Sequence, residues 1–367
     1  MKTKQLTGAE AVMHCLREEK VQTIFGYPGG AIMPIYDALY DFKDEIQHIL
    51  VRHEQGAIHA AQGFARVSKQ TGVVFATSGP GATNLITGLA DAMIDSTPVV
   101  CITGQVASHL LGTDAFQETD VIGISMPVTK WNVQVTRAED IAPALAKAFY
   151  IARTGRPGPV LVDITKDAQF GKCDFTYQAC TSIRSYVPQP KMSMDAIQSA
   201  AELLNAAHKP YLLIGQGILL SEAEDALMDF ADKTGIPVAS TLLGLGAFPA
   251  DHPQYIGYLG MHGNYAPNVL TNECDVLLAI GMRFDDRVTG DVARYAKQAK
   301  VIHVDIDAAE LNKIIPADVA IHADAKTALV ELTKRVENRN HGQWLQQFRD
   351  LEQIEQDEII SAAIHPE

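Results

Sequence analysis

The sequence has few basic residues for its length. Of its 367 residues, 30 are lysine or arginine and 44 are aspartate or glutamate, which gives a net charge of −14. A surface that binds nucleic acid needs a basic face, so this charge argues against a nucleic-acid partner. A small phosphate-bearing cofactor remains compatible with it, because backbone amides can hold phosphate.

Cysteine is also scarce, and the cysteines are scattered. They form no C-x-x-C pair and show no zinc-like spacing with histidine, so we predict no metal ligands in this chain. The odd, dispersed set fits reduced thiols in a cytoplasmic protein better than a disulfide framework. The five are Cys15, Cys101, Cys173, Cys180 and Cys274.

Long apolar runs and several familiar catalytic motifs are missing. No stretch reaches the roughly 18 apolar residues that a membrane-spanning helix needs, and the first residues lack the apolar core of a signal peptide. We therefore expect no membrane partner. The sequence contains no Gly-x-Ser-x-Gly elbow, no Walker loop and no His-Glu-x-x-His helix.

What the sequence does have is apolar strands that alternate with helices. Apolar residues make up 47% of the chain, enough for large cores in two ordinary domains. Continuous apolar strands between helices indicate parallel sheets covered on both faces. The predicted fold class is therefore α/β, with two successive three-layer domains built on central parallel sheets. The predicted strands are 23–26, 48–51, 72–77, 98–104 and 159–164, then 211–214, 237–240, 276–280 and 301–305.

The domain boundaries follow from where this alternation stops. We expect residues 1–168 to form the first domain and residues 191–345 the second. Between them, over 169–190, Pro188 and Pro190 stiffen a polar stretch that is typical of a linker.

Glu54 is the most informative single residue. It follows the strand at 48–51 and precedes a helix rich in alanine and glycine. Small residues let backbones approach and exclude water, and burial suits a carboxyl group to proton transfer. Taken alone, this glutamate is better explained as an acid at the positive end of a helix dipole.

Two glycine turns favour a binding site beside this glutamate. Gly29-Gly30 and Gly79-Pro80-Gly81 follow the strands at 23–26 and 72–77, and ligands of open parallel sheets lie at the carboxyl ends of strands. Either turn taken alone is explained by glycines that simply allow a tight turn. Together with Glu54 they point to a ligand, and Asn84 is expected on the first turn of the next helix.

The second series of strands carries half of a dinucleotide motif. Gly215 and Gly217 follow a strand, but Leu220 stands where the third glycine belongs and the acidic partner is missing, so the motif is weak evidence for a nicotinamide site. Other strand ends meet at the same edge, with amides and arginines for phosphates and carboxylates for ribose hydroxyls. Arg283 and Arg287, four residues apart, fit an anion site or a solvated pair.

Several segments together resemble the acetohydroxyacid synthases (acetolactate synthases) of the thiamine-diphosphate enzyme family. The segment around Glu54 marks the broad family, whereas Gly-Thr-Asp-Ala-Phe-Gln-Glu at 112–118 and Arg-Phe-Asp-Asp-Arg at 283–287 are more specific to these synthases. The resemblance covers roughly residues 5–345. Its segments are 25–31, 52–57, 76–85, 102–106, 112–118, 155–163 and 281–290.

The resemblance implies catalytic roles for Glu54, Gly30 and Gln117. Glu54 would hydrogen-bond the pyrimidine ring of thiamine diphosphate and drive formation of its reactive ylide, while Gly30 would offer its backbone near the reacting carbon. Tyr27, Pro80 and Asn84, like Gln117, would line the pyrimidine or the reacting centre. Phe116 and Lys166 would form the wall of the substrate channel.

The resemblance also implies FAD in a structural role. Many family members have three consecutive glycines where this chain has Gly215-Gln216-Gly217, a departure that bears on FAD affinity. The positions that match FAD contacts are Arg156, Gly215, Gly217, Thr241, Leu242, Gly260, Met261, His262, Gly281, Arg283, Asp285, Arg287, Asp305, Ile306 and Asp324.

The implied activity is a transferase of branched-chain amino acid biosynthesis, which leads to valine, leucine and isoleucine. It condenses pyruvate with pyruvate or 2-ketobutyrate and releases CO2. A homodimer or tetramer and a small regulatory subunit are the implied partners.

A third domain, with a Gly-Asp-Gly…Asn motif for Mg2+ and diphosphate, is expected in the family but is not found in this sequence. Residues 346–367 are expected to be the helical start of the linker to it. The chain would then be truncated or a natural fragment, and incomplete for catalysis.

Two other interpretations stay open. One is a different thiamine-diphosphate enzyme, such as pyruvate oxidase or another 2-keto acid carboligase or decarboxylase, against which Phe116, Gln117, Glu118 and Lys166 weigh. The other is a non-catalytic subunit that pairs with complete chains, which the missing metal motif would explain.

Overall fold

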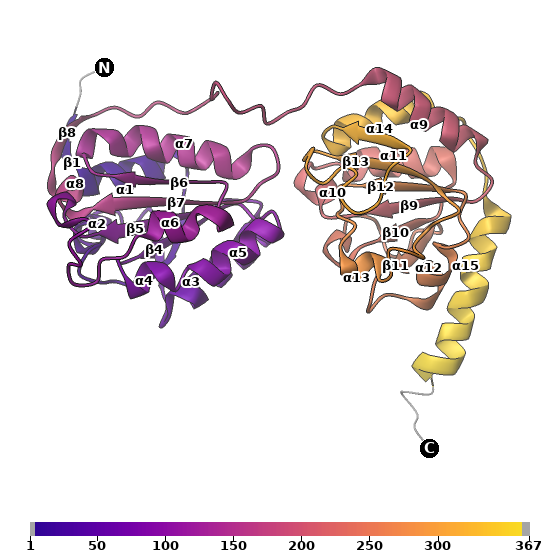
Figure 1. Cartoon of the computed structure of the whole chain (residues 1–367), viewed down its shortest axis with the longest axis horizontal. Coiled ribbons are helices and arrows are strands. Elements are labelled where there is room, and N and C mark those ends of the chain that lie inside the picture. Colours follow the sequence, from indigo (N-terminus) through magenta and orange to yellow (C-terminus); the bar gives the residue numbers. More distant parts are fainter. Residues whose placement is uncertain (1–3, 362–367) are drawn as a thin grey trace. The chain divides into compact units, whose positions relative to one another are not determined.

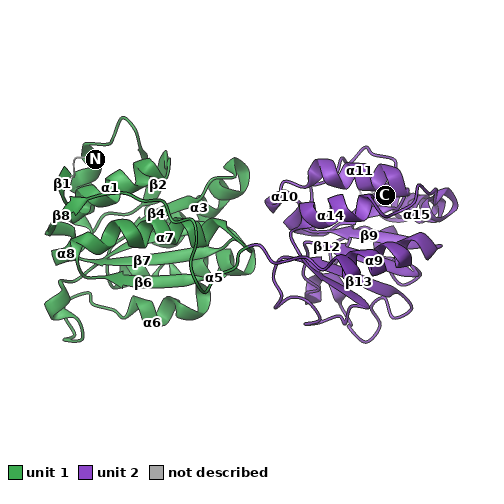
Figure 2. Cartoon of the chain, turned by 90° about the horizontal axis from the view of Figure 1, so that it is seen from above, with its two compact units in different colours: residues 1–188 green, residues 189–367 purple. Residues whose placement is uncertain are grey.

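The structure, a computed structural model, describes residues 4–361. Figure 1 shows the order of its helices and strands along the chain. The chain divides into two compact units, residues 1–188 and 189–367 (Figure 2). Each unit has its own sheet and core, and each is described by itself.

Unit 1 is built on a six-stranded sheet with the order β3-β2-β4-β5-β7-β6, in which all neighbouring strands are parallel. A separate antiparallel pair joins β1 to β8. The strands are β1 Lys4–Thr7, β2 Thr23–Gly26, β3 Gln47–Leu50, β4 Gly72–Ala76, β5 Val99–Gln105, β6 Trp131–Val135, β7 Pro159–Thr165 and β8 Lys172–Phe175.

Helices cover both faces of this sheet (Figure 1). α1, α2 and α7 pack on one face, and α3, α5 and α6 on the other, each face with its own apolar cluster. The α-helices are α1 Gly8–Glu18, α2 Met33–Tyr40, α3 Glu54–Ser68, α4 Pro80–Thr83, α5 Ile86–Ile94, α6 Val121–Ser125, α7 Ile141–Arg153 and α8 Lys166–Phe170. Short 3-10 helices are η1 Ser108–Leu110, η2 Met126–Val128 and η3 Ala138–Asp140.

Unit 2 repeats the three-layer plan with the strand order β11-β10-β9-β12-β13-β14, again all parallel. α9, α11 and α14 pack on one face, and α12 and α15 on the other. The strands are β9 Pro210–Ile214, β10 Val238–Ser240, β11 Tyr255–Tyr258, β12 Val276–Ile280, β13 Lys300–Asp305 and β14 Val319–His322. The helices are α9 Met194–Ala206, α10 Gly217–Leu220, α11 Glu224–Thr234, η4 Leu242–Gly244, α12 Tyr265–Leu270, α13 Asp286–Thr289, α14 Ala325–Thr333, α15 Gly342–Glu355 and the π-helical η5 Gln356–Ile360.

The inner strands explain why the chain adopts this class of fold. β5, β7, β9 and β12 are buried along their whole length, as strands of a parallel sheet covered on both faces must be. Cys101 lies in this core, fully buried on β5, as predicted. The predicted α/β class with two parallel-sheet domains is confirmed.

In the two six-stranded sheets, the sequence analysis missed three strands, β6, β11 and β14; it also missed β1 and β8 of the separate antiparallel pair. The first three lie at sheet edges, and most of their residues are only partly buried. An edge strand can keep polar side chains, so it lacks the continuous apolar run that marks an inner strand.

The structure also differs from the predicted domain boundaries. The linker expected at 169–190 starts too early, because Lys172–Phe175 forms β8 and pairs with β1. Further along that stretch, the Tyr186 hydroxyl donates to the carbonyl of Thr154 at 2.5 Å. Tyr186 therefore belongs to unit 1. At the other end, α15 runs across the expected boundary at 345, and Trp344 and Phe348 pack in the core of unit 2. The last part of the predicted 346–367 segment, residues 362–367, lies outside the described residues.

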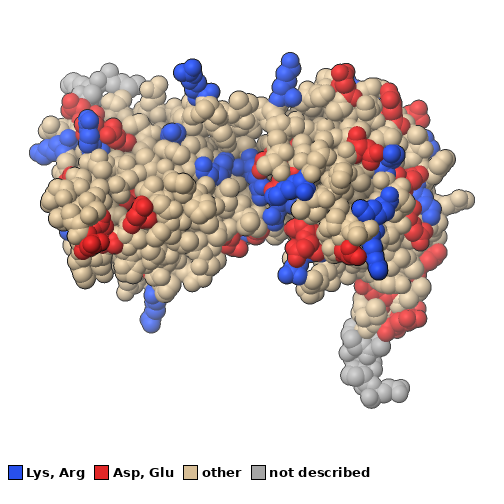
Figure 3. All heavy atoms as spheres, viewed as in Figure 1, with Lys and Arg blue, Asp and Glu red and all other residues tan. Residues whose placement is uncertain are grey.

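Charged side chains of both signs are spread over the face of the molecule in Figure 3. No helix within residues 4–361 has the length and apolar character needed to cross a membrane. The same residues contain no group of three or more His, Cys, Asp or Glu side chains placed to hold a metal ion.

Candidate functional site

The first candidate site lies at the carboxyl edge of the sheet in unit 1. β2 and β4 are neighbours there although β3 lies between them in the sequence, so this is the switch point at which ligands of open α/β sheets bind. The turns after both strands meet at this point. The N–H of Tyr27 donates to the carbonyl of Phe75 at 3.3 Å, and the N–H of Ala31 donates to Thr77 Oγ1 at 3.2 Å.

Glu54 is the buried acid of this edge. It is the first residue of α3, directly after the N-cap His53, and only 7% of it is exposed. Asn84 Nδ2 donates to Glu54 Oε2 at 2.9 Å, and a Cβ atom added to Gly81 would lie 3.3 Å from Oε1. The structure therefore joins three residues that the sequence analysis named separately. Asn84 itself is the C-cap of α4 rather than part of the first turn of α5.

The Gly30 turn faces open space. Gly30 is exposed, and a Cβ atom added to it would meet no other atom within 4 Å. Tyr27 and Pro80, on the two turns that flank the switch point, are also exposed. A ligand can therefore approach the backbone at this turn without displacing a side chain.

Gln117 reaches the same edge through its backbone. Gly79 has a φ of +55°, and a Cβ atom at that position would stand 2.6 Å from the carbonyl oxygen of Gln117, so the loop and the turn are in close contact. Gln117 itself has a φ of +61°. The neighbouring Phe116 is 87% exposed.

The loop that carries Phe116 and Gln117 is closed by Glu118. Its carboxylate accepts the N–H groups of Gly112 and, at 3.1 Å, Ala115. These backbone donors lower the pKa of Glu118, so it is ionised near neutral pH. Lys166, the other expected channel residue, begins α8 at the carboxyl end of β7 and is partly buried.

A buried network beneath this edge was missed by the sequence analysis. Asp163 on β7 is fully buried and accepts hydrogen bonds from Thr103 Oγ1 at 2.6 Å, Gln134 Nε2 at 3.0 Å and Gln105 Nε2 at 3.1 Å. Burial raises the pKa of Asp163, and the three donors offset part of that rise. The only signal in the sequence was an aspartate in an apolar strand, since its partners come from other strands.

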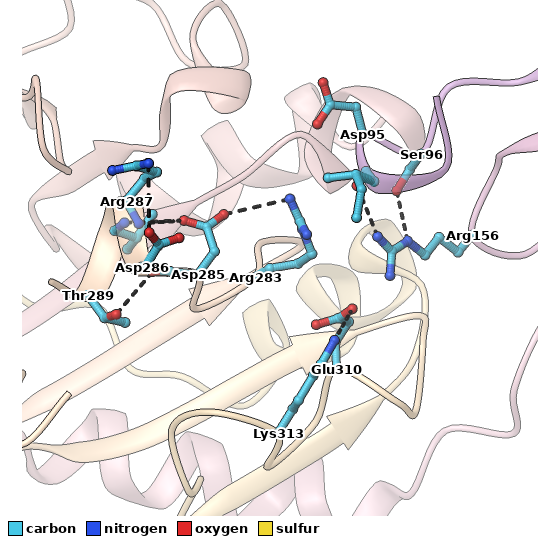
Figure 4. A network of polar contacts seen from close by, with 12 residues as sticks. Asp95, Ser96, Arg156, Arg283, Asp285, Asp286, Arg287, Thr289, Glu310 and Lys313 are labelled. Carbon is cyan, nitrogen blue, oxygen red and sulfur yellow. Dashed lines mark hydrogen bonds and ion pairs between the residues drawn. The ribbon is translucent and has the colours of Figure 1, made fainter. Parts of the chain in front are cut away.

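Arg156 does not join these residues within unit 1. It lies between α7 and β7, at the amino end of β7 and so opposite the edge that carries Glu54. Its Nε donates to Ser96 Oγ at 2.8 Å and its Nη2 to the carbonyl of Ile94 at 3.1 Å (Figure 4).

A second candidate site lies at the switch point of unit 2, between β9 and β12. Numbered along the chain, its strands have the order 3-2-1-4-5-6, which is the order of dinucleotide-binding folds. Gly215 follows β9 and Gly281 follows β12. A Cβ atom on Gly215 would stand 2.3 Å from the carbonyl oxygen of Gly281, so only glycine allows these two turns to touch.

The amides of these glycine turns are used inside the protein. The N–H of Gly215 donates to Ile280 at 3.0 Å and that of Gly217 to Gly281 at 2.9 Å. In the described structure these two N–H groups are therefore paired within the protein, and the glycines allow the two turns to approach closely. The amides of Thr241 and Met261 are also paired, with Ile214 and Arg287, at 2.8 and 2.7 Å.

The exposed rim of this edge carries apolar and polar side chains. Leu242, Met261 and His262 are all exposed. Gly260, before them, has a φ of +131°, and Asn268 bonds to both its N–H and its carbonyl.

Charged side chains complete the edge. Arg283 Nη2 lies 3.6 Å from Asp285 Oδ2, and Asp285 also caps α13 by accepting the N–H of Arg287 at 3.0 Å (Figure 4). The Arg287 side chain lies 3.8 Å from Asp286. Asp305, at the end of β13, is 8% exposed and accepts the N–H of Asp307 at 2.8 Å. Ile306 follows, and Asp324 caps α14.

Sequence comparisons place both candidate sites in known domains. Residues 6–124 match the family model described as thiamine pyrophosphate enzyme, N-terminal TPP binding domain, and residues 197–332 match the thiamine pyrophosphate enzyme central domain. The chain belongs to the thiamine pyrophosphate enzyme family. The first match includes Glu54 and the turns around it, and the second includes the switch point of unit 2.

Individual relatives in this family are similar over most of the chain. The acetolactate synthase of Mycobacterium bovis is 52% identical over 329 residues, which are 90% of this chain and 53% of the relative. The acetolactate synthase isozyme 2 large subunit of Escherichia coli is 50% identical over 345 residues, 94% of this chain and 62% of the relative. A probable acetolactate synthase large subunit of Methanocaldococcus jannaschii is 47% identical over 355 residues, 95% of this chain and 60% of the relative. The chain thus spans less than two thirds of the length of each of these relatives.

Proposed function

We propose that this chain forms the pyrimidine-binding and central domains of an acetolactate synthase, a transferase that condenses two 2-keto acids with loss of CO2. The observation that carries the proposal is the buried Glu54 carboxylate, held by Asn84 beside the open Gly30 turn at the switch point of unit 1. Relatives named acetolactate synthase at about half identity support it.

The Glu54 site fits the pyrimidine ring of thiamine diphosphate. Oε2 is occupied by the Asn84 amide, whereas no donor within residues 4–361 reaches Oε1. Oε1 is therefore the atom that exchanges a proton with a ring nitrogen of the cofactor. When bound, thiamine diphosphate supplies the carbon nucleophile for attack on a keto group.

The other residues of this edge bind and orient the substrates, pyruvate and 2-ketobutyrate. Gly30 lets the keto group approach the backbone, and Gln117 supplies an amide at the opposite turn. Lys166 supplies a positive charge for the substrate carboxylate, while Phe116 forms an apolar wall. Tyr27 and Pro80 line the pyrimidine.

Unit 2 is the FAD-binding part of the same proposal. Its strand order and the contact between Gly215 and Gly281 support a dinucleotide at the switch point. Arg283 and Arg287 suit the diphosphate, and Asp305 suits a ribose hydroxyl. The proposed FAD contacts of unit 2 also include Gly217, Thr241, Leu242, Gly260, Met261, His262, Asp285, Ile306 and Asp324, while Arg156 of unit 1 stays a prediction from the resemblance.

In this proposal, Mg2+ and the cofactor diphosphate are bound by residues other than those named above. We assign no metal ligand within residues 4–361. The proposed assembly is a homodimer or tetramer that pairs with a small regulatory subunit.

The replacement Glu54→Gln tests the catalytic part of the proposal. The glutamine keeps the shape and the contact with Asn84 but cannot carry the proton, so acetolactate formation from pyruvate should fall by about 10²- to 10⁴-fold. The assay uses these residues joined to a diphosphate-binding domain. Glu18→Gln, at an exposed position of α1, is the matched control and should keep the parent rate. A Glu54→Gln variant within twofold of the parent rate would falsify the proton-transfer role.

Titration with FAD tests unit 2 on the present chain. Saturable binding with a changed visible flavin spectrum is expected, and Arg283→Ala should weaken it by at least about tenfold, since a diphosphate loses a charged donor. Arg294→Ala, which removes an exposed arginine whose Nε lies 3.4 Å from Asp291 Oδ2, is the control. Equal affinity in the two variants removes Arg283 from the site, and no binding by the parent chain rejects FAD.

A further inference from the structure

Gln169 is a buried side chain beside the candidate active site to which neither the sequence motifs nor the proposed chemistry gives a role. It lies on the short helix α8 and is fully buried. Its Nε2 atom donates to the carbonyl of Ala31 at 2.8 Å and to that of Ile164 at 2.9 Å. Ala31 is separated from Gln169 by 138 positions in the sequence and directly follows Gly30.

The backbone of Ala31 is held at both its N–H and its carbonyl group. Its N–H donates to Thr77 Oγ1 at 3.2 Å, on the turn after β4. Its carbonyl oxygen accepts the hydrogen bond from Gln169 Nε2. The same oxygen packs on β5, since a Cβ atom added to Gly104 would stand 2.4 Å from it. Gly30, one residue earlier, is exposed and faces open space. The orientation of the open peptide is thus set by fixed groups on its carboxyl side.

A second contact of α8 reaches the loop that leads to Gln117. Asp167 accepts the N–H of Ser108 at 2.9 Å and the Ser108 hydroxyl at 2.5 Å. Partial burial raises the pKa of Asp167, but hydrogen bonds from Ser108, together with those from Thr165 and the Asp167 backbone, outweigh it and lower this pKa to about 2. α8, which also begins with Lys166, therefore contacts both segments that border the site.

The chemistry of glutamine suits this place. Its amide group has two N–H donors, and each pairs with one buried carbonyl without bringing a charge into the core. A glutamate here would lack those donors when ionised, and an apolar side chain would leave both carbonyls short of a partner.

We propose that Gln169 is a positioning residue that fixes the Gly30 turn and thereby orients the 2-keto acid for attack. The inference rests on the proposed function for the identity of the substrate. The physical contact itself does not depend on that function, so the two can be tested separately.

Hydrogen exchange on the present chain tests the contact. In Gln169→Met, exchange of the amides at 29–32 should rise at least about tenfold, because the carbonyl side of the turn is released. Gln62→Met is the matched control, since Gln62 is also a buried glutamine, 3% exposed, whose Nε2 donates to a backbone carbonyl, that of Gly88, at 3.0 Å. This control should change exchange around Gly88 and leave 29–32 protected. Equal exchange at 29–32 in both variants overturns the proposal.

Kinetics of the protein joined to a diphosphate-binding domain test the consequence. Gln169→Met should lower kcat for pyruvate about tenfold or more with a smaller change in KM, because misorientation acts on the reacting geometry, and Gln62→Met should keep the parent kcat. In Gln169→Glu, kcat relative to the parent should recover as the pH falls, since only the protonated carboxyl can donate to Ala31.

The outcomes separate the two proposals. A parent protein that makes no acetolactate rejects the proposed function, while the exchange result still decides the contact. An active parent with an undiminished kcat in both Gln169 variants overturns the positioning role.

Discussion

Two buried carboxyl groups in unit 1 have opposite surroundings. Asp163 accepts three hydrogen bonds from the protein, so its oxygens are committed to the sheet. From residues 4–361, Glu54 accepts one, from Asn84, and its other oxygen borders the Gly81 turn. The difference explains why we assign Glu54 to chemistry and Asp163 to structure, although both are nearly removed from water.

The pH dependence of stability should reveal Asp163. Because its pKa is raised on folding, the folded protein holds this proton more tightly than the unfolded chain does. The stability that this group contributes is therefore fully present below its ordinary pKa of 3.8 and is lost as the pH rises through the raised value.

The variant Asp163→Asn lacks this titration. The free energy of unfolding of the parent minus that of the variant should decrease as the pH rises above 3.8. Urea unfolding followed by Trp131 fluorescence, in a Trp344→Phe background, measures it for unit 1. Asp37→Asn, at an exposed position, is the control, and its difference should show no such decrease. If the difference in free energy of unfolding between the parent and Asp163→Asn does not change with pH, the argument that burial raises the pKa of Asp163 is wrong.

At the residue scale, local sequence was enough for some site residues and not for others. Glu54 and the Gly30 turn follow strands whose place is predicted by the alternation of strands and helices, whereas Gln117 was named only from the resemblance. Asp163 and Gln169 could not be assigned, because their partners come from neighbouring strands or from a turn more than a hundred residues away. Register and packing decide those contacts, and one sequence does not give them.

Helix α3 shows how small residues place the site. It carries Glu54 at its start and packs closely on α5, where a Cβ atom on Gly88 would stand 2.1 Å from Ile58 Cγ2. Gly63, on the same helix, has no neighbour within 4 Å of an added Cβ. Close packing at one glycine and open space at the other give opposite expectations for alanine.

Gly88→Ala should destabilise unit 1 by about 1–3 kcal/mol, because the added methyl group forces Ile58 or α5 to shift. Gly63→Ala should stabilise it by about 0.5–1 kcal/mol, since alanine favours a helix interior. Urea unfolding followed by Trp131 compares the two. Equal effects of the two substitutions would show that α3 and α5 are not packed as described.

At the element scale, the inner strands were predictable and the edges were not. β5 and β12 have the unbroken apolar runs of strands buried on both faces. β6, with Asn132 and Gln134, keeps polar side chains that bond to α6 and to Asp163. Those partners make the strand stable, but they cannot be read from its own residues.

The two units share one plan with different strand orders. Both have six parallel strands and a switch point bordered by glycine turns, between β2 and β4 in unit 1 and between β9 and β12 in unit 2. Unit 2 alone has the order of dinucleotide-binding folds. At the scale of the whole molecule, this difference supports the proposal, first drawn from the resemblance, that the pyrimidine binds to unit 1 and FAD to unit 2.

Product analysis with pyruvate tests the central claim most directly. These residues, joined to a diphosphate-binding domain and supplied with thiamine diphosphate, Mg2+ and FAD, would be incubated with labelled pyruvate, and the carbon products identified. We predict acetolactate, with one CO2 released for every two molecules of pyruvate consumed. Acetaldehyde or acetyl phosphate as the main product would contradict the account and indicate a decarboxylase or an oxidase instead.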